Sequence, residues 1–309
     1  MQNARFLLLA LVVAALTFGF VKQINNAYVF FAGYVVLQYI ALATAWNILG
    51  GYTGYVNFGT AGFFALGAYT TVMLHKIMPL LPLPAMMLAG GLVSGVIGLA
   101  MGYLTLRLRG AFFSIATLAM AIVAQTLITN WDFVGGSRGA YIIRPTHSPI
   151  LGGDYIQYLF IVMLILAAAS VTVARAIEHS RLGYGFSAIR DDELAAEASG
   201  VPTLRLKLIA TVLSGGLMGM AGAPLPYYVT YIDPASGFSL SYAVNTIAMP
   251  LIGGMGSWAG PVIGAILIAV MEQIAVVTIS SALSLLLVGL LLVAFVVAAP
   301  RGILGWFGR

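Results

Sequence analysis

The sequence predicts an all-α fold, a polytopic helical membrane protein with about ten transmembrane helices. Of its 309 residues, 61% are hydrophobic and only 7% are charged, a composition far from that of soluble domains. The apolar residues form continuous runs, most of them long enough to cross a ~30 Å hydrocarbon core at ~1.5 Å per helical residue. We therefore expect a single membrane domain over residues 1–309 and no separate soluble domain.

The expected spans follow from these apolar runs. They cover residues 6–21, 28–49, 60–74, 84–106, 111–131, 155–174, 208–228, 241–253, 261–279 and 283–299. The first is interpreted as an uncleaved span, since no small-residue cleavage site follows it. The third and eighth are too short to cross the core upright without flanking segments.

The distribution of Lys and Arg predicts that both termini are cytoplasmic. If the spans alternate, ten of the 14 basic residues lie on the side that holds the loop 175–207, and cytoplasmic loops carry the excess of Lys and Arg. These ten are Arg5, Arg107, Arg109, Arg175, Arg181, Arg190, Arg205, Lys207, Arg301 and Arg309, whereas Lys22, Lys76, Arg138 and Arg144 lie outside. Because the cations lie at span ends and form no basic stripe, the net charge of +5 indicates topology and no nucleic-acid partner.

The loop 175–207 is the most charged part of the chain. Within it, residues 187–199 are expected to form one helix, with acids early in it and with Gly200 and Pro202 ending it. Its small face comprises Ala195, Ala196 and Ala198. We interpret this helix as a rigid docking element for a soluble partner and its flanking cations, Arg175, Arg181, Arg205 and Lys207, as topology anchors. An ordinary solvated loop helix would explain the charges but not the alanine face.

Two glycine-rich interruptions occur, at 46–67 and 252–264. Irregular backbone at membrane depth is tolerated where it is buried or lines an aqueous cavity, so paired breaks suggest a translocation path. Tight turns and small-residue packing are the alternative. The candidate polar path residues are Asn47, Tyr52, Tyr55, Asn57, Asn245 and Glu272. Hydrogen-bonded packing explains each of them about equally well, and Glu272 is the clearest ionisable group within a predicted span.

The chain lacks the motifs of an enzyme. None of its three lysines follows a glycine, as the phosphate-binding loop of an ATPase requires, and its three histidines are far apart. The absence of cysteine removes thiolate chemistry and Cys-based metal sites. We expect no catalytic site, no metal and no cofactor bound by this chain.

At the charged loop the segment 193–200, ELAAEASG, resembles the coupling motif of ABC importer permeases. Further motifs resemble branched-chain amino acid ABC transporter permeases of the LivM type over nearly the whole chain. They are GGYTGYVNFG at 50–59, GAYT at 67–70, TLA at 117–119, GGS at 135–137 with Gly139, AIRD at 188–191, IGG at 252–254, GPVIGA at 260–265 and PRG at 300–302.

The resemblance implies one ABC importer permease domain in the bacterial inner membrane, moving branched-chain or related amino acids inward by alternating access. It implies a second related permease, two cytoplasmic ATPases that hold ATP and Mg, and an extracytoplasmic solute-binding protein. The ATPase-coupling residues it implies are Arg190, Asp191, Glu193, Ala195, Ala196 and Gly200. The alternatives are an ion-coupled secondary carrier or channel for small polar solutes, or an ABC permease for urea or amides.

Overall fold

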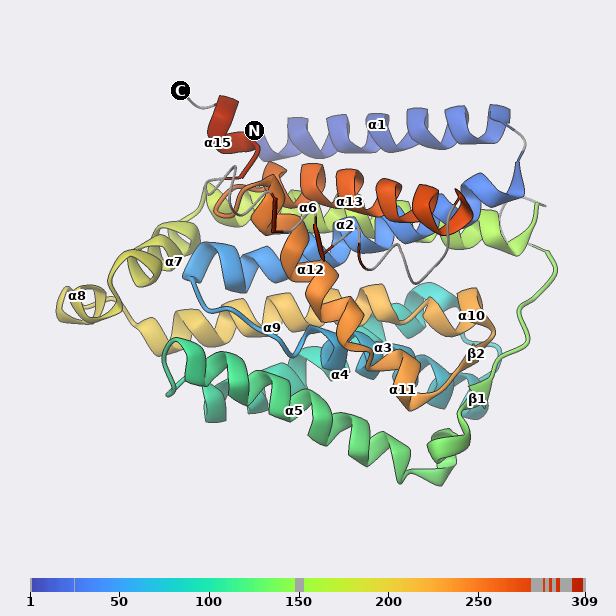
Figure 1. Cartoon of the computed structure of the whole chain (residues 1–309), viewed down its shortest axis with the longest axis horizontal. Coiled ribbons are helices and arrows are strands. Elements are labelled where there is room, and N and C mark those ends of the chain that lie inside the picture. The colour runs from blue at the N-terminus through green and yellow to red at the C-terminus, as the bar shows by residue number, and fades with distance from the viewer. Residues whose placement is uncertain are drawn as a thin grey trace.

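A computed structural model describes residues 2–24, 26–147, 153–278, 286, 289–290, 293–294 and 302–307. Most of the tenth expected span, 283–299, lies outside the described residues. The described chain is mostly helical, and its long helices run roughly side by side in one bundle (Figure 1).

The long helices are α1 (Gln2–Ile24), α2 (Ala27–Thr53), α3 (Thr60–Ile77), α4 (Leu83–Thr105), α5 (Ala111–Thr129), α6 (Tyr155–Glu178), α9 (Thr203–Gly222), α12 (Leu240–Gly253) and α13 (Ala259–Thr278). The short elements are η1 (Asp132–Val134), η2 (Gly136–Arg138), α7 (Arg181–Asp191), α8 (Glu193–Ala198), α10 (Leu225–Val229), α11 (Pro234–Gly237) and α15 (Leu304–Phe307). Strand β1 (Ala140–Tyr141) pairs antiparallel with β2 (Tyr231–Ile232), with Ala140 opposite Ile232.

Six helices of the described residues are long and apolar enough to cross a membrane. They cover Ala27–Thr53, Leu83–Thr105, Ala111–Thr129, Tyr155–Glu178, Thr203–Val229 and Ala259–Val277. The chain is therefore a multi-pass membrane protein by its helices, while the figure of about ten spans stays a prediction. Helix α12 has only 14 residues, or about 21 Å, which agrees with the expectation that the eighth segment is too short to cross alone.

The first glycine-rich break is shorter than expected, since α2 continues through Gly50 and Gly51 to Thr53. A Cβ at Gly50 would lie 2.5 Å from the ring of Trp46, one turn earlier in the same helix. The glycine therefore makes room for this buried indole. Irregular backbone is confined to residues 54–59. That segment runs along α5, where Ser114 Oγ donates to the Val56 carbonyl at 2.8 Å. Extended chain buried against protein thus precedes the 18-residue α3.

The second break is also short, with irregular backbone only at residues 254–258. Gly264 belongs to α13, where a Cβ would lie 1.9 Å from the Met249 carbonyl oxygen. It therefore serves the close packing of α12 on α13, as the packing alternative predicted.

Helices α3, α4 and α9 also meet through small residues, as the glycine spacing of α4 and α9 suggests. A Cβ at Gly67 of α3 would lie 1.9 Å from the Gly219 carbonyl oxygen of α9, and one at Gly219 would lie 2.2 Å from Ser94 Oγ of α4. Ser94 is fully buried and donates to the Phe63 carbonyl at 3.0 Å. These backbones are therefore in direct contact at the centre of the fold.

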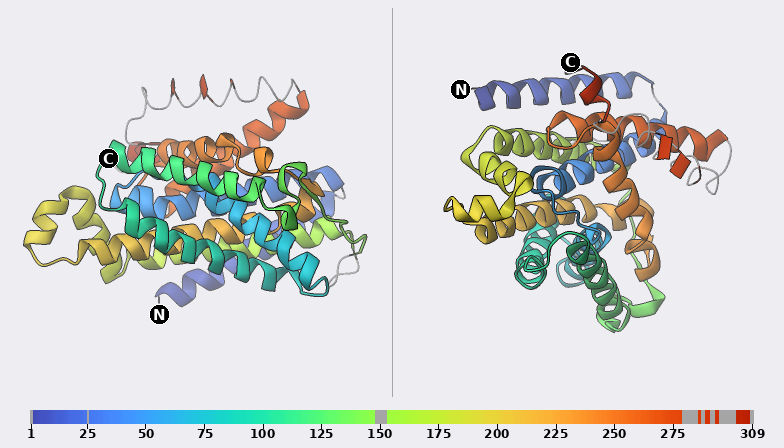
Figure 2. Two further views of the ribbon diagram at one scale, coloured as in Figure 1. Left: turned by 90° about the horizontal axis from the view of Figure 1, so that it is seen from below. Right: turned by 60° about the vertical axis from the view of Figure 1, so that its left-hand side comes forward.

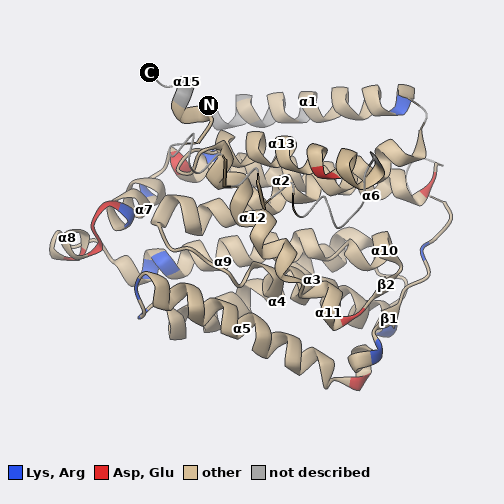
Figure 3. Cartoon of the chain, in the orientation of Figure 1, with Lys and Arg blue, Asp and Glu red and all other residues tan. Residues whose placement is uncertain are grey.

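The two ends of the bundle differ in their number of basic residues (Figure 3). The N-terminal end of α1, α15 and the segment α7–α8 lie at one end, and β1 and β2 lie at the other (Figure 1). By the elements that hold them, and among residues with described side chains, the first end carries Arg107, Arg109, Arg175, Arg181, Arg190, Arg205 and Lys207, and the second carries Lys22, Lys76, Arg138 and Arg144. The first and last described residues, 2 and 307, lie on the side of the charged loop (Figure 1).

Candidate functional site

The charged loop folds as two short helices that project from the bundle, which we call the α7–α8 tip (residues 181–200; Figure 1). Helix α7 begins after Ser180, whose hydroxyl oxygen accepts from the amides of Leu182 and Gly183. It ends at Asp191, because Asp192 is extended, with φ −160° and ψ 107°, and accepts from the Ala195 amide at 3.0 Å. The expectation of a single helix over 187–199 is therefore wrong, since Asp192 acts as the N-cap of a second helix.

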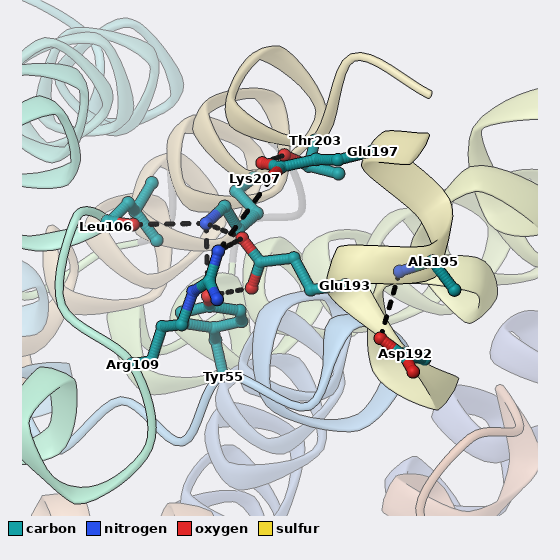
Figure 4. Close-up of polar contacts among 9 residues, drawn as sticks. All are labelled: Tyr55, Leu106, Arg109, Asp192, Glu193, Ala195, Glu197, Thr203 and Lys207. Carbon is teal, nitrogen blue, oxygen red and sulfur yellow. Dashed lines mark hydrogen bonds and ion pairs between the residues drawn. The ribbon is translucent and has the colours of Figure 1, made fainter. Parts of the chain in front are cut away.

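Glu193, the first residue of α8, points back into the protein. Lys207 of α9 donates to Glu193 Oε1 at 2.7 Å, to Tyr55 Oη at 3.1 Å and to the Leu106 carbonyl at 3.1 Å. The Tyr55 hydroxyl donates to the other carboxylate oxygen of Glu193. We call Tyr55, Arg109, Glu193 and Lys207 the Glu193 network (Figure 4).

The Glu193 network is buried at its centre and open at one side. The Lys207 side chain is 4% exposed and that of Glu193 is 12% exposed, whereas Arg109, 3.9 Å from Glu193, is 52% exposed. An exposed pair at such a distance contributes little to stability. A lysine ammonium taken out of water needs its hydrogen bonds, and here its three partners come from three segments. The network therefore ties α8 to α9, to residues 54–59 and to the end of α4.

The environment of Glu193 favours its charged form. Burial alone would raise the pKa of Glu193, but the hydrogen bonds from Lys207 and Tyr55 and the charges of Lys207 and Arg109 outweigh it and hold the pKa below the usual 4.5. Because this pKa is lowered in the folded state, the stabilisation is complete above about pH 4.5 and is lost as the pH falls through the folded-state pKa.

We expect the difference in unfolding free energy between the wild type and Glu193→Gln to be largest near about pH 7 and to shrink below about pH 4, because protonation then gives both chains a neutral side chain at this position. Unfolding in mixed micelles across this pH range measures the difference. A difference that stays constant to about pH 3 would contradict the proposed charge of Glu193.

Arg190, predicted to be a coupling residue, lies where the two glycine-rich breaks meet. Its Nη1 donates to the Gly51 carbonyl at 3.4 Å. A Cβ at Gly54 would lie 3.2 Å from Arg190 Cγ, and one at Gly256 would lie 2.9 Å from Arg190 Nη1. A pocket of about 480 Å³ opens beside these residues and is also lined by Arg109 and Glu193. The breaks therefore converge at the end of the bundle that bears the α7–α8 tip.

Further polar contacts join the second break to α2 and α6. Asn47 Nδ2 donates to the Ser257 carbonyl at 3.0 Å, while its buried Oδ1 has no partner among the described residues. Glu178 Oε2 accepts from the Trp258 amide at 2.7 Å and from the Tyr52 hydroxyl at 3.3 Å. Asn47 and Tyr52, predicted for a path, thus have structural partners near the tip.

The remaining predicted path residues lie in two other places. Asn57 Oδ1 accepts from the Gly59 amide at 2.7 Å, a local turn within 54–59. Asn245 Nδ2 donates to Tyr39 Oη at 3.2 Å and to Glu272 Oε2 at 3.3 Å. Glu272 is in α13 (Ala259–Thr278), about 20 Å along the helix from its start. The six predicted residues therefore do not form one cluster, and a role in a path stays a prediction.

The outer surface of the α7–α8 tip combines small and apolar groups. Ala195 and Gly200 are exposed, Asp191 has a side chain 74% exposed, and Ala196 is buried. Leu194 is 62% exposed, and Tyr184 is 74% exposed. Neither Leu194 nor Tyr184 was among the site residues predicted from the sequence.

Sequence reasoning also missed Lys207, which was interpreted as a topology anchor at the membrane surface. Its side chain instead lies inside the Glu193 network. The available signal was its position in the first turns of an apolar segment, where an ionisable group needs a partner. Arg109 was likewise assigned only to topology, although it lies 3.9 Å from Glu193 and from Glu197.

The sequence profile described as branched-chain amino acid transport system / permease component matches residues 28–296. The chain is 30% identical to LivM, the high-affinity branched-chain amino acid transport system permease protein of Salmonella typhimurium, and 29% identical to LivM of Escherichia coli. Each alignment covers 97% of this chain and 75% of the relative.

One solved structure, an inward-facing conformation of a metal-chelate type ABC transporter, superimposes with a TM-score of 0.48 and 13% identity. That alignment covers 96% of this chain and 99% of the other.

Proposed function

Because the chain belongs to the branched-chain amino acid transport system permease component family, we propose that it is the transmembrane permease subunit of an ABC importer. It moves branched-chain or related amino acids inward by alternating access. The chain itself is not an enzyme and holds no ATP, since separate ATPase subunits bind ATP and Mg and carry out hydrolysis.

The proposed assembly contains a second related permease, two cytoplasmic ABC ATPases and an extracytoplasmic solute-binding protein. The chain lies in the bacterial inner membrane, with the α7–α8 end in the cytoplasm and the β1–β2 end outside. The excess of Lys and Arg at the α7–α8 end supports this orientation. The β1–β2 end would then face the binding protein.

The observation that carries the proposal is the connection of the projecting tip to the membrane helices. The outer face of the tip presents Leu194 and Tyr184, apolar groups suited to contact with a protein surface. On its inner side, Glu193 reaches Lys207 and Tyr55 in the bundle. Glu193 is therefore proposed as a link inside the permease, in place of the direct ATPase contact inferred from the resemblance alone.

The Glu193 network gives a route from ATPase movement to the membrane helices. A displacement of α8 would act on α9 through Lys207, on residues 54–59 through Tyr55 and on the end of α4 through the Leu106 carbonyl. Residues 54–59 lead directly into α3 and are hydrogen-bonded to α5. Several helices of the bundle are thus placed to move together when ATP is hydrolysed.

Uptake by the reconstituted assembly tests this function. Proteoliposomes that contain the chain, its partner permease and its ATPases are expected to accumulate leucine only with ATP inside and the binding protein outside. Uptake by the chain alone under a proton or sodium gradient would support the secondary-carrier alternative and overturn the proposal.

We expect Leu194→Asp to reduce ATP-driven uptake about tenfold, because a charged group buried unpaired in the ATPase contact costs roughly 1–3 kcal/mol. Leu194→Met is the matched control, since it keeps an apolar side chain of similar volume at the same 62% exposed position. Equal uptake by the two variants, with both chains folded, would rule out Leu194 as part of the docking face.

A further inference from the structure

An open apolar groove of about 780 Å³ runs between α1 and the rest of the bundle. Helix α1 lies along the outer edge of the bundle (Figure 1 and the right-hand view of Figure 2). It contacts α6, where the rings of Phe18 and Phe160 lie 6.4 Å apart. The groove is lined by α1, α2, α6 and α13, with Val13, Ala32, Ala168 and Val270 among its lining residues.

The length of the groove matches the hydrocarbon part of a membrane. On α13 it extends from Trp258, just before the helix, to Val277, about 28 Å of helix at 1.5 Å per residue. Tyr28 lines the other end. Trp and Tyr are enriched at membrane interfaces, so these two rings mark both ends of a groove filled in between by apolar side chains.

Arg175, at the Trp258 end, has no carboxylate partner within 4 Å among the residues that the structure describes. The Arg175 guanidinium is 4.1 Å from the Phe6 ring centroid and 5.3 Å from that of Trp258, and both aromatic residues line the groove. All nine acidic residues belong to the described part of the chain, and none of their carboxylates lies within 4 Å of Arg175. The nearby Glu178 carboxylate is instead hydrogen-bonded to Trp258 and Tyr52.

We propose that this groove binds an anionic phospholipid, with an acyl chain along α1, α2 and α13 and the phosphate at Arg175. Basic sites between transmembrane helices bind anionic headgroups in this way. An entirely apolar transmembrane helix from another subunit would fill the groove but would offer no negative charge to Arg175 at its mouth. A phospholipid satisfies both the apolar walls and the charge.

The lipids that the purified chain retains test whether the groove binds an anionic phospholipid. The full chain is released from nanodiscs of phosphatidylethanolamine and phosphatidylglycerol in equal amounts, and the bound lipids are identified by native mass spectrometry. The wild type is expected to retain more phosphatidylglycerol than phosphatidylethanolamine. We expect Arg175→Gln to reduce that preference about fivefold. Arg181→Gln is the control and is expected to leave the preference unchanged, because Arg181 is exposed and does not line the groove.

The apolar part of the groove is tested separately. Ala32→Trp places an indole inside the groove and is expected to lower retention of both lipids, whereas Leu88→Trp, at a 59% exposed position of α4, leaves retention unchanged. Because the chain has no cysteine, Val13→Cys carrying a photoreactive maleimide reports what occupies the groove even if Ala32→Trp misfolds. A lipid adduct supports the proposal. An adduct with a partner subunit in the assembled transporter, or an unchanged lipid preference in Arg175→Gln, overturns it.

Discussion

Lys207→Met is expected to lower the free energy of unfolding by about 3 kcal/mol, because it leaves a mostly buried carboxylate without its cation. In the wild type, Glu193 Oε1 is 2.7 Å from Lys207 Nζ. Arg109 cannot replace that partner, since its guanidinium lies 3.9 Å away and its side chain is 52% exposed. We expect α8 to detach from the bundle before the whole chain unfolds, because no other described segment supplies a close cation to Glu193.

A double-mutant cycle separates the loss of the ion pair from a general effect of substitution. Glu193→Gln combined with Lys207→Met is expected to recover most of the lost stability, since a buried pair replaced by neutral groups is often tolerated. Arg205→Met is the control on the same helix, because Arg205 is exposed. If Lys207→Met were as stable as Arg205→Met in mixed-micelle unfolding, the Glu193 network would not hold α8.

The membrane class and most helix positions could be predicted from the sequence, because long apolar runs are a strong local signal. The breaks were less predictable. Gly50 and Gly51 suggest an interruption by composition, yet both are helical because their missing side chains make room for Trp46 and Asn47. Whether a glycine ends a helix or lets a neighbour pack against it depends on contacts that a sequence does not display.

The candidate site could be predicted only in part for the same reason. The charge density of the loop 175–207 identified the tip, and Glu193 was named as a site residue. Its partners lie at positions 55 and 207, and neither separation has a periodicity that a local pattern would reveal. Asp192 lies between two good helix-forming segments, so only its extended backbone shows that it ends one helix and caps the next.

Gly67→Ala is expected to lower the free energy of unfolding strongly, because Gly67 lies in the small-residue contact among α3, α4 and α9. Its new Cβ would lie 1.9 Å from the Gly219 carbonyl oxygen and 2.7 Å from the Gly219 Cα. These are backbone atoms, which cannot rotate away as a side chain would. The two helices must separate, and we expect overpacking of this kind to cost about 3 kcal/mol.

The same substitution one turn of α9 before Gly219 provides the control. Gly216 faces α4, and its Cβ would meet only the Gly91 carbonyl oxygen at 3.4 Å, an ordinary contact. Gly216→Ala is therefore expected to be neutral or to stabilise by up to about 1 kcal/mol, since alanine favours the helix. Both variants add one methyl group in the same region of helix contact. The difference between their unfolding free energies in mixed micelles therefore reports how closely the helix backbones approach each other. Equal stability of the two variants would mean that α3 and α9 can move apart freely. Helices packed so loosely could not transmit a displacement of α8. The proposed coupling through Lys207 and α9 to the other membrane helices would then fail.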